Sequence, residues 1–154
     1  TRSRPGAASC ARRTALRALL DKFEGPVVLD ADALNALAPD LNLLKASKAQ
    51  LVLTPHPGEF ATLTGRSNSD AKSERVALSR QLAAKLNAVV VIKGARTIIT
   101  APDGELFVNP TGNPGLATAG SGDVLAGVLG ALLAVAGFWM LADWPRTRPE
   151  TRPA

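Results

Sequence analysis

The sequence predicts an α/β fold in which helices cover both faces of a mostly parallel sheet. Three short apolar runs, 26–32, 49–54 and 88–94, are rich in Val, Ile and Leu, and segments of helical spacing separate them. This alternation is typical of parallel strands joined by helical crossovers. With 154 residues, 46% of them hydrophobic, the chain can form one domain with a buried core.

The first half of the chain contains two strands and three helical segments. Residues 14–23 place leucines and a phenylalanine at helical spacing, and Gly25 and Pro26 end that helix. The run 26–32 reads as a buried strand that ends in acidic residues. Brief helical turns follow at 33–37 and 41–46, and 49–54 is the next strand.

The second half predicts a longer helix, a third strand, a hairpin and a final helix. Asp70 can cap a helix that continues to about Leu86, with leucines repeating on one face. Residues 97–109 read as an antiparallel hairpin around Asp103-Gly104. After an irregular loop, the last helix is expected to begin near Gly120.

The charge distribution divides the chain into a neutral centre and basic ends. Residues 1–20 hold five arginines and no acidic residue, whereas 21–142 hold 10 basic and 11 acidic residues within a net charge of +5. We therefore expect an Arg-rich, poorly ordered tail over 1–14, a partial domain over 15–135, and an atypical, disordered tail over 136–154.

This composition argues against several classes of protein. A neutral centre with no tyrosine and 4% aromatic residues lacks both a basic footprint and stacking platforms, so no nucleic-acid partner is expected. The single cysteine, Cys10, cannot form an internal disulfide, and no Cys/His cluster has metal-ligand spacing. A reducing, cytoplasmic compartment is the expectation.

The uncharged run from Val124 to Ala142 has two interpretations. Its 19 residues meet the length criterion for a membrane span. However, the run is rich in Ala and Gly, and it follows a glycine-spaced polar loop that suits a ligand site. We therefore expect a buried helix over 124–133 and no membrane.

Polar residues follow each predicted parallel strand. In parallel sheets, ligands bind where the carboxyl ends of the strands meet. Asp30, Asp32 and Asn35 follow the first strand, where they either face this cleft or cap the next turn. His56 and Glu59 follow the second strand, and Glu59 could equally stabilise a helix start.

The stretch 120–123, Gly-Ser-Gly-Asp, precedes the last predicted helix. Two residues without Cβ atoms allow a ligand to approach the unpaired N–H groups of a helix N-terminus, where anions bind. A carboxylate at Asp123 would repel bound phosphate, yet it could accept a proton from an attacking hydroxyl. Its alternative role is simple stabilisation of the helix's first turn.

Four motifs in order, VVLDADALNAL, LVLTPHPGEFATLTG, VVVIKGARTII and NPTGNPGLATAGSGDVLAG, resemble the NAD(P)H-hydrate dehydratase family. The resemblance covers about 26–133 and implies a ribokinase-like fold, incomplete at both ends. It also implies an ADP- or ATP-dependent enzyme that repairs hydrated NADH and NADPH. In that family a phosphoryl group moves to the ring hydroxyl, and loss of phosphate restores the cofactor.

The resemblance also implies roles for particular residues. Asp123 would be the catalytic base and, with His56, would bind the hydrated substrate. The nucleotide-binding residues would be Lys93, Gly94, Ala95, Arg96, Thr97, Gly120, Ser121 and Gly122. Further candidates are Asp32, Asn35, Glu59 and Asn113. Mg²⁺ is implied as cofactor with ADP or ATP, without a dedicated metal site, and full-length members are expected to form homo-oligomers.

Two alternatives remain open at this stage. A ribokinase-like kinase for a vitamin precursor would share the glycine turn and the parallel sheet. A non-catalytic fragment that holds a nucleotide without turning it over would share the same motifs.

Overall fold

The computed structural model describes residues 7–112 and 118–143 of the chain. The helices are α1 (Ala7–Lys22), α2 (Ala31–Leu37), α3 (Asn42–Lys45), α4 (Pro57–Thr64), α5 (Asn68–Ser73), α6 (Arg75–Leu86) and α7 (Ser121–Asp143). The strands are β1 (Pro26–Leu29), β2 (Gln50–Leu53), β3 (Ala88–Ile92), β4 (Ile98–Thr100) and β5 (Leu106–Val108).

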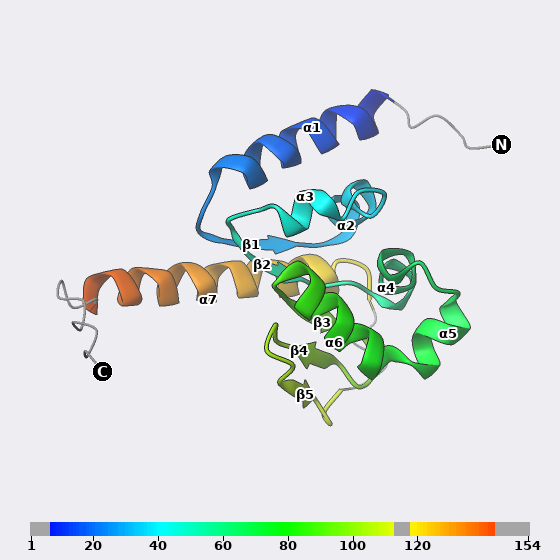
Figure 1. Cartoon of the computed structure of the whole chain (residues 1–154). Helices are drawn as coiled ribbons and strands as arrows, with labels where there is room; N and C mark the ends of the chain where they lie inside the picture. The colour runs from blue at the N-terminus through cyan, green and yellow to red at the C-terminus, as the bar shows by residue number, and fades with distance from the viewer. Residues whose placement is uncertain (1–6, 113–117, 144–154) are drawn as a thin grey trace, which may run out of the picture.

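The five strands form one sheet in the order β1-β2-β3-β4-β5 (Figure 1). β1 and β2 pair in parallel, as do β2 and β3, whereas β4 and β5 join as an antiparallel hairpin. Gly104 takes a φ of +91° in the hairpin turn, a conformation that glycine adopts without strain. The predicted fold class, a parallel core with an attached antiparallel hairpin, is confirmed.

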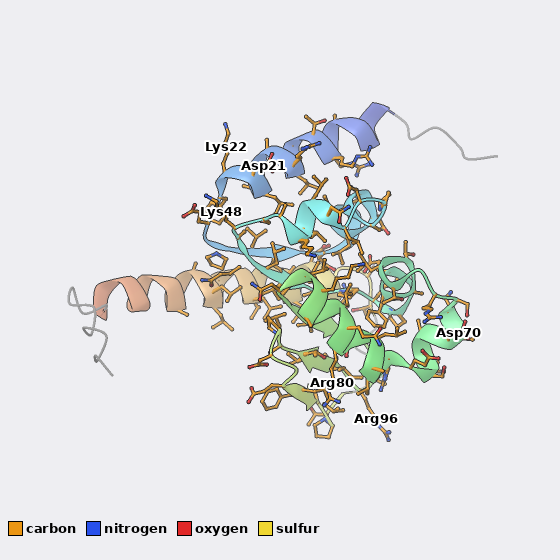
Figure 2. All side chains as sticks on the ribbon, in the orientation of Figure 1. Asp21, Lys22, Lys48, Asp70, Arg80 and Arg96 are labelled. Carbon is orange, nitrogen blue, oxygen red and sulfur yellow. The ribbon has the colours of Figure 1, made fainter. Side chains whose placement is uncertain are left out.

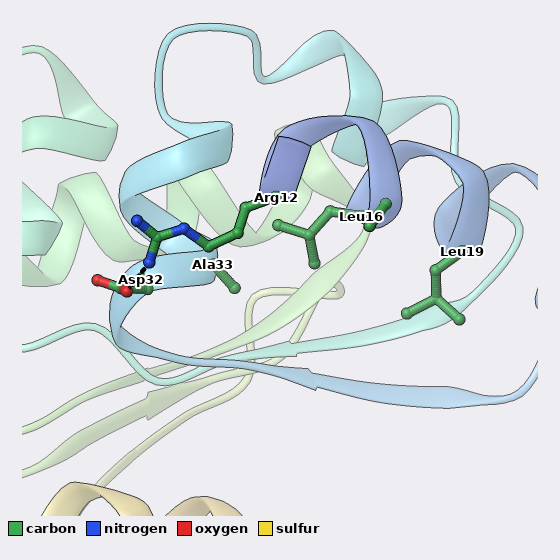
Figure 3. A pocket seen from close by; sticks show the side chains of 6 residues that line it. Arg12, Leu16, Leu19, Asp32 and Ala33 are labelled. Carbon is green, nitrogen blue, oxygen red and sulfur yellow. Dashed lines mark hydrogen bonds and ion pairs between the residues drawn. The ribbon is translucent and has the colours of Figure 1, made fainter. Parts of the chain in front are cut away.

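Helices lie on both faces of the sheet. The connections β1 to β2 and β2 to β3 step in the same direction along the sheet. Because connections between parallel strands are right-handed, their helices, α2 to α6, lie on the same face. Figure 2 shows α6 in front of the strands, and α6 packs against β3 and β4. α7 returns along the opposite face and packs against β1, so that in Figure 3 its first turns lie below the strands, while α1 and α2 lie above them.

The core lies between the sheet and its first layer of helices. Leu53 and Val90 on the central strands are fully buried, and Phe60 of α4 packs in the same cluster at 1% exposure. Helices α1, α2, α3, α4 and α6 contribute further leucines to this cluster: Leu20, Leu34, Leu37, Leu44, Leu63, Leu78, Leu82 and Leu86. Removal of this apolar surface from water is the main stabilising contribution.

The helix that the sequence predicts over 70–86 is divided into α5 and α6, and its expected cap is wrong. Ser67 is the N-cap of α5, and its Oγ accepts the N–H of Asp70 at 3.2 Å. Asp70 lies in the first turn instead, and its carboxylate accepts the Ser67 hydroxyl at 2.6 Å. The helix breaks at Glu74, which leaves helical geometry at φ −103° and ψ 13°.

α7 begins next to Gly120, as expected, but the prediction that 124–133 is a buried helix is wrong. Val124, Val128, Leu132 and Val135 are 67%, 50%, 61% and 55% exposed. These four side chains form one stripe along the helix, here called the α7 stripe. In the described part of the chain, β1 is the main contact of α7, and it covers the other side of the helix. None of the described helices is long and apolar enough to cross a membrane.

The helix bounds differ from the expected domain limits at both ends. α1 begins at Ala7, so residues 7–14 are helical where the sequence predicts a poorly ordered tail. α7 ends at Asp143 and thus extends into the segment expected to be an atypical tail from residue 136. Helical structure therefore extends beyond the expected domain limits at both ends.

Candidate active site at the carboxyl ends of the strands

Backbone hydrogen bonds join the carboxyl ends of the three parallel strands beyond the strands themselves. The Thr54 N–H donates to the Leu29 carbonyl at 3.1 Å, and the Lys93 N–H donates to the Pro55 carbonyl at 2.9 Å. The residues that follow, Asp30, His56 and Lys93, therefore emerge from neighbouring strands at one edge of the sheet. The structure brings these three strand ends together as the sequence predicts.

Asp30 and Lys93 form an ion pair across this edge. The Lys93 Nζ lies 2.6 Å from Asp30 Oδ1, and the two side chains are 22% and 12% exposed. Lys93 is therefore a paired and largely shielded cation at the end of its strand. Asp30 is also the N-cap residue of α2, but its side chain makes no capping hydrogen bond.

The glycine turn lies directly against this ion pair. A Cβ atom on Gly122 would lie 3.3 Å from Lys93 Nζ and 3.4 Å from Asp30 Oδ2, which is closer than most real contacts. Gly120 has a φ of +85°, and its carbonyl accepts the Val124 N–H at 3.1 Å, which starts α7. Asp123 follows in the first turn of α7 with an exposed side chain.

His56 and Glu59 form a capping box at the start of α4. The His56 Nδ1 accepts the N–H groups of Gly58 at 3.0 Å and Glu59 at 3.3 Å, while Glu59 Oε2 accepts the His56 N–H at 2.8 Å. Because Nδ1 is an acceptor, the ring hydrogen of neutral His56 lies on Nε2, which is 3.3 Å from Glu59 Oε1. The His56 side chain is 55% exposed and Glu59 is buried, so the geometry assigns Glu59 to the helix start.

The segment from Gly94 to Thr97 forms a turn between β3 and β4. The Thr97 hydroxyl donates to the Gly94 carbonyl at 3.1 Å, and the Asn109 N–H donates to the Thr97 carbonyl at 2.9 Å. Ala95 and Arg96 are exposed, and Figure 2 shows Arg96 projecting from the lower side of the molecule. The turn therefore exposes its backbone and the Arg96 guanidinium group to solvent beside Lys93.

Asp32 and Asn35 lie apart from this site. Asp32 is 75% exposed and pairs with Arg12 of α1, with which it lines a groove of about 340 Å³ between α1 and α2 (Figure 3). Asn35 is exposed on α2. Asp30 is the strand-end acid that reaches Lys93, and its signal in the sequence is its position immediately after the strand. Asn113 lies outside the described residues.

No group of three or more His, Cys, Asp or Glu side chains among the described residues could hold a metal ion. A second cavity of about 420 Å³ lies at the opposite end of the strands, beside Gln50 and Asn87. Neither of these two cavities is lined by Asp30, His56 or Lys93. Any Mg²⁺ at the strand ends would take most of its ligands from nucleotide phosphates and water, as Mg²⁺ commonly does.

The parallel strand ends, the partly buried ion pair and the helix N-terminus behind a glycine turn define the class of an α/β protein with polar groups gathered at the carboxyl ends of its strands. A lysine ammonium group and helical N–H groups meet there. The chain belongs to the NAD(P)H-hydrate dehydratase family, whose sequence profile matches residues 6–143.

Individual relatives agree with this assignment. The chain is 50% identical over 117 residues to the bifunctional NAD(P)H-hydrate repair enzyme Nnr of Moorella thermoacetica, and it covers 22% of that protein. It is also 50% identical over 119 residues to the ADP-dependent (S)-NAD(P)H-hydrate dehydratase of Neisseria meningitidis, 40% of which it covers. These matches use 76% and 75% of this chain.

The fold is similar to a solved member of the family. The ADP/ATP-dependent NAD(P)H-hydrate dehydratase from Bacillus subtilis, co-crystallized with ATP/Mg²⁺, matches with a TM-score of 0.63 and 38% identity. The match covers 75% of this chain and 39% of that one. The chain thus spans two fifths or less of the length of these relatives.

Proposed function

We propose that this chain dehydrates hydrated NADH or NADPH at the expense of ADP or ATP, and that the carboxyl ends of its parallel strands bind the phosphate groups. The observation that carries the proposal is the packing of Gly122 against the Lys93 ammonium group at the strand ends. This arrangement aims a cation and the first N–H groups of α7 at the same place, where a terminal phosphate would be stabilised.

The reaction assigns a different task to each group. The oxygen of the ring hydroxyl attacks the terminal phosphorus, and Asp123 accepts the hydroxyl proton. The bond between that phosphorus and the rest of the nucleotide breaks in the same step. The turn from Gly120 to Gly122 holds the transferring phosphoryl oxygens, with the N–H groups of Gly120 and Gly122 as donors, since the Ser121 N–H donates to the Thr118 carbonyl at 3.2 Å. Lys93 to Thr97 contact the nucleotide. His56 contacts the hydrated ring through its exposed edge. The lone pair of the ring nitrogen then expels phosphate as the ring C–O bond breaks, and loss of a proton from the adjacent ring carbon forms the double bond that restores NADH or NADPH.

Mg²⁺ belongs to this proposal as the partner of ADP or ATP. When bound, it neutralises phosphate charge during transfer. The carboxylate chemistry of the site suits this ion, because Asp123 is exposed next to the glycine turn. We also place the protein in the cytoplasm, with small-molecule substrates, with no nucleic-acid partner and, for full-length members, as a homo-oligomer.

The direct test incubates the chain with hydrated NADH, Mg²⁺ and either ADP or ATP. Recovery of NADH absorbance and release of inorganic phosphate are followed together. We expect both signals to rise in equal amounts, and to disappear without nucleotide. Phosphate retained on an alcohol substrate instead of released would favour a vitamin-precursor kinase.

Calorimetry separates the remaining alternative. Binding of ADP without phosphate release would favour a nucleotide-binding piece that lacks the rest of the substrate site. Failure of both binding and turnover would contradict the proposed function for this chain.

A further inference from the structure

We propose that Asp30 is a positioning residue, which fixes the Lys93 ammonium group beneath the first turn of α7 so that it meets the nucleotide phosphate there. The expected contact between Lys93 and phosphate rests on the proposed function, whereas the contact between Asp30 and Lys93 does not. Asp30 itself contacts Lys93 rather than the reacting atoms. It therefore acts through Lys93.

The local backbone shows that Asp30 serves Lys93 rather than its own helix. Asp30 occupies the N-cap position of α2, where an aspartate normally accepts an N–H of the first turn. Its side chain makes no such bond, and Oδ1 accepts from Lys93 Nζ at 2.6 Å. The next residue, Ala31, has a φ of +45°, a strained conformation for alanine. Such strain persists only where the surrounding contacts maintain it.

Among the Lys and Arg ion pairs of the described residues, this pair is the least exposed. Lys48 and Glu24 are 73% and 69% exposed, and Arg17 and Asp21 are 65% and 61% exposed. Exposed pairs of this kind contribute little, because solvent screens them. Asp30 and Lys93 are 12% and 22% exposed, so each charge depends on the other for compensation.

The glycine turn completes the arrangement. Gly122 lacks the Cβ atom that would lie 3.3 Å from Lys93 Nζ and 3.4 Å from Asp30 Oδ2. The ion pair therefore lies directly under the peptide groups that are proposed to hold the phosphoryl oxygens. A lysine with four rotatable bonds would otherwise lose side-chain freedom when it binds phosphate. Asp30 restricts the Lys93 side chain before the ligand binds.

A double-mutant cycle tests the coupling, with ADP and Mg²⁺ as the probe. We expect Asp30→Asn to raise the Kd for ADP about tenfold, and Lys93→Met to raise it at least as much. In the Lys93→Met background, Asp30→Asn should add no further loss, because its only effect passes through Lys93. Asp21→Asn removes the same charge from an exposed position on α1 and should leave the Kd unchanged.

A purely structural role for Asp30 would give additive losses in the cycle, which would overturn the proposal. Unchanged or tighter ADP binding by Asp30→Asn would overturn it as well, since Asp30 would then only mask the lysine charge. Thermal unfolding of each variant identifies those that fold.

A second pair of variants keeps the test decisive if Asp30→Asn fails to fold. Gly122→Ala places a methyl group against Lys93 Nζ, whereas Gly130→Ala adds the same group on α7 where nothing lies within 4 Å. We expect weaker ADP binding from Gly122→Ala alone. Equal effects of the two substitutions would contradict the inference.

A readout without nucleotide distinguishes failure of this inference from failure of the proposed function. In ¹³C NMR of lysine Cε groups, Lys93 should be restricted in the unmodified chain and as mobile as surface lysines in Asp30→Asn. Its signal is assigned by its loss in Lys93→Met. A restricted Lys93 in a chain that does not bind ADP would support the positioning role and contradict only the proposed function. A mobile Lys93 in the unmodified chain would overturn the positioning role.

Discussion

At the scale of single residues, two glycines in one turn act for different physical reasons. Gly120 supplies a backbone conformation, at a φ of +85°, that side chains disfavour. Gly122 supplies space, since a Cβ atom there would contact the Lys93–Asp30 pair. The turn therefore depends on both the flexibility and the small size of glycine.

Gly120→Ala should lower the free energy of unfolding by about 1–2 kcal/mol, because alanine is strained at this φ. No atom lies within 4 Å of the added Cβ, so the loss reflects backbone strain rather than a clash. Chemical denaturation measures the difference. Gly127→Ala, in the open middle of α7, is the control and should be neutral or stabilising. An unaltered stability in Gly120→Ala would show that the turn relaxes easily.

Asp123→Asn should reduce dehydratase turnover by about 10²–10⁴-fold, the usual contribution of a positioned general base. The side chain is exposed, so the unfolding temperature should remain close to that of the unmodified chain. Phosphate release and thermal unfolding are measured on the same preparation. Full turnover in Asp123→Asn would refute the proposed role of this carboxylate.

At the scale of elements, α4 shows how one side chain can serve both a helix and a surface. His56 Nδ1 accepts two N–H groups of the first turn, and Glu59 returns a bond to the His56 N–H. A Cβ atom on Gly58 would lie 2.9 Å from the imidazole Cε1 and 3.2 Å from Nδ1, so this edge of the ring lies against the glycine. The remaining exposed edge of the ring is available to a ligand.

His56→Ala should destabilise the chain by about 1 kcal/mol, because α4 loses its cap. His56→Asn retains a short acceptor at the N-cap and should keep most of that stability. In both variants the proposed contact to the hydrated ring is lost, so the KM for hydrated NADH should rise. Urea unfolding and substrate titration separate the two effects. Equal destabilisation by Ala and Asn would contradict the capping role.

At the scale of the whole molecule, the two faces of the sheet are covered unequally. The face under α2 to α6 holds the buried cluster around Leu53 and Phe60. On the other face, α7 packs against β1 and leaves the α7 stripe in solvent. Contiguous apolar surface of this kind promotes association.

The double variant Val128→Glu/Leu132→Lys should raise the protein concentration at which light scattering begins. Glu and Lys at this spacing support the helix, so the unfolding temperature should change little. Leu129→Glu, on the half-buried side of α7, is the matched control and should lower the unfolding temperature instead. If the double variant unfolds at a lower temperature, the α7 stripe is packed in solution.

The alternation of apolar runs and turn residues was sufficient to predict most elements. The strands, the hairpin and the start of α7 follow from period, β-branching and glycine placement, which are local properties. The strand-end location of His56 and Lys93 followed from the general rule for parallel sheets. Their chemical roles, and that of Asp123, remain predictions.

The sequence alone determined which residue types are available at each strand end, because local spacing decides where strands stop. Only the tertiary structure decided that Asp30, rather than Asp32, pairs with Lys93, since that contact joins residues 63 positions apart. The same holds for the Ser67 cap of α5 and the exposure of the α7 stripe. Each depends on which surfaces meet when the chain folds, and a linear pattern does not contain that information.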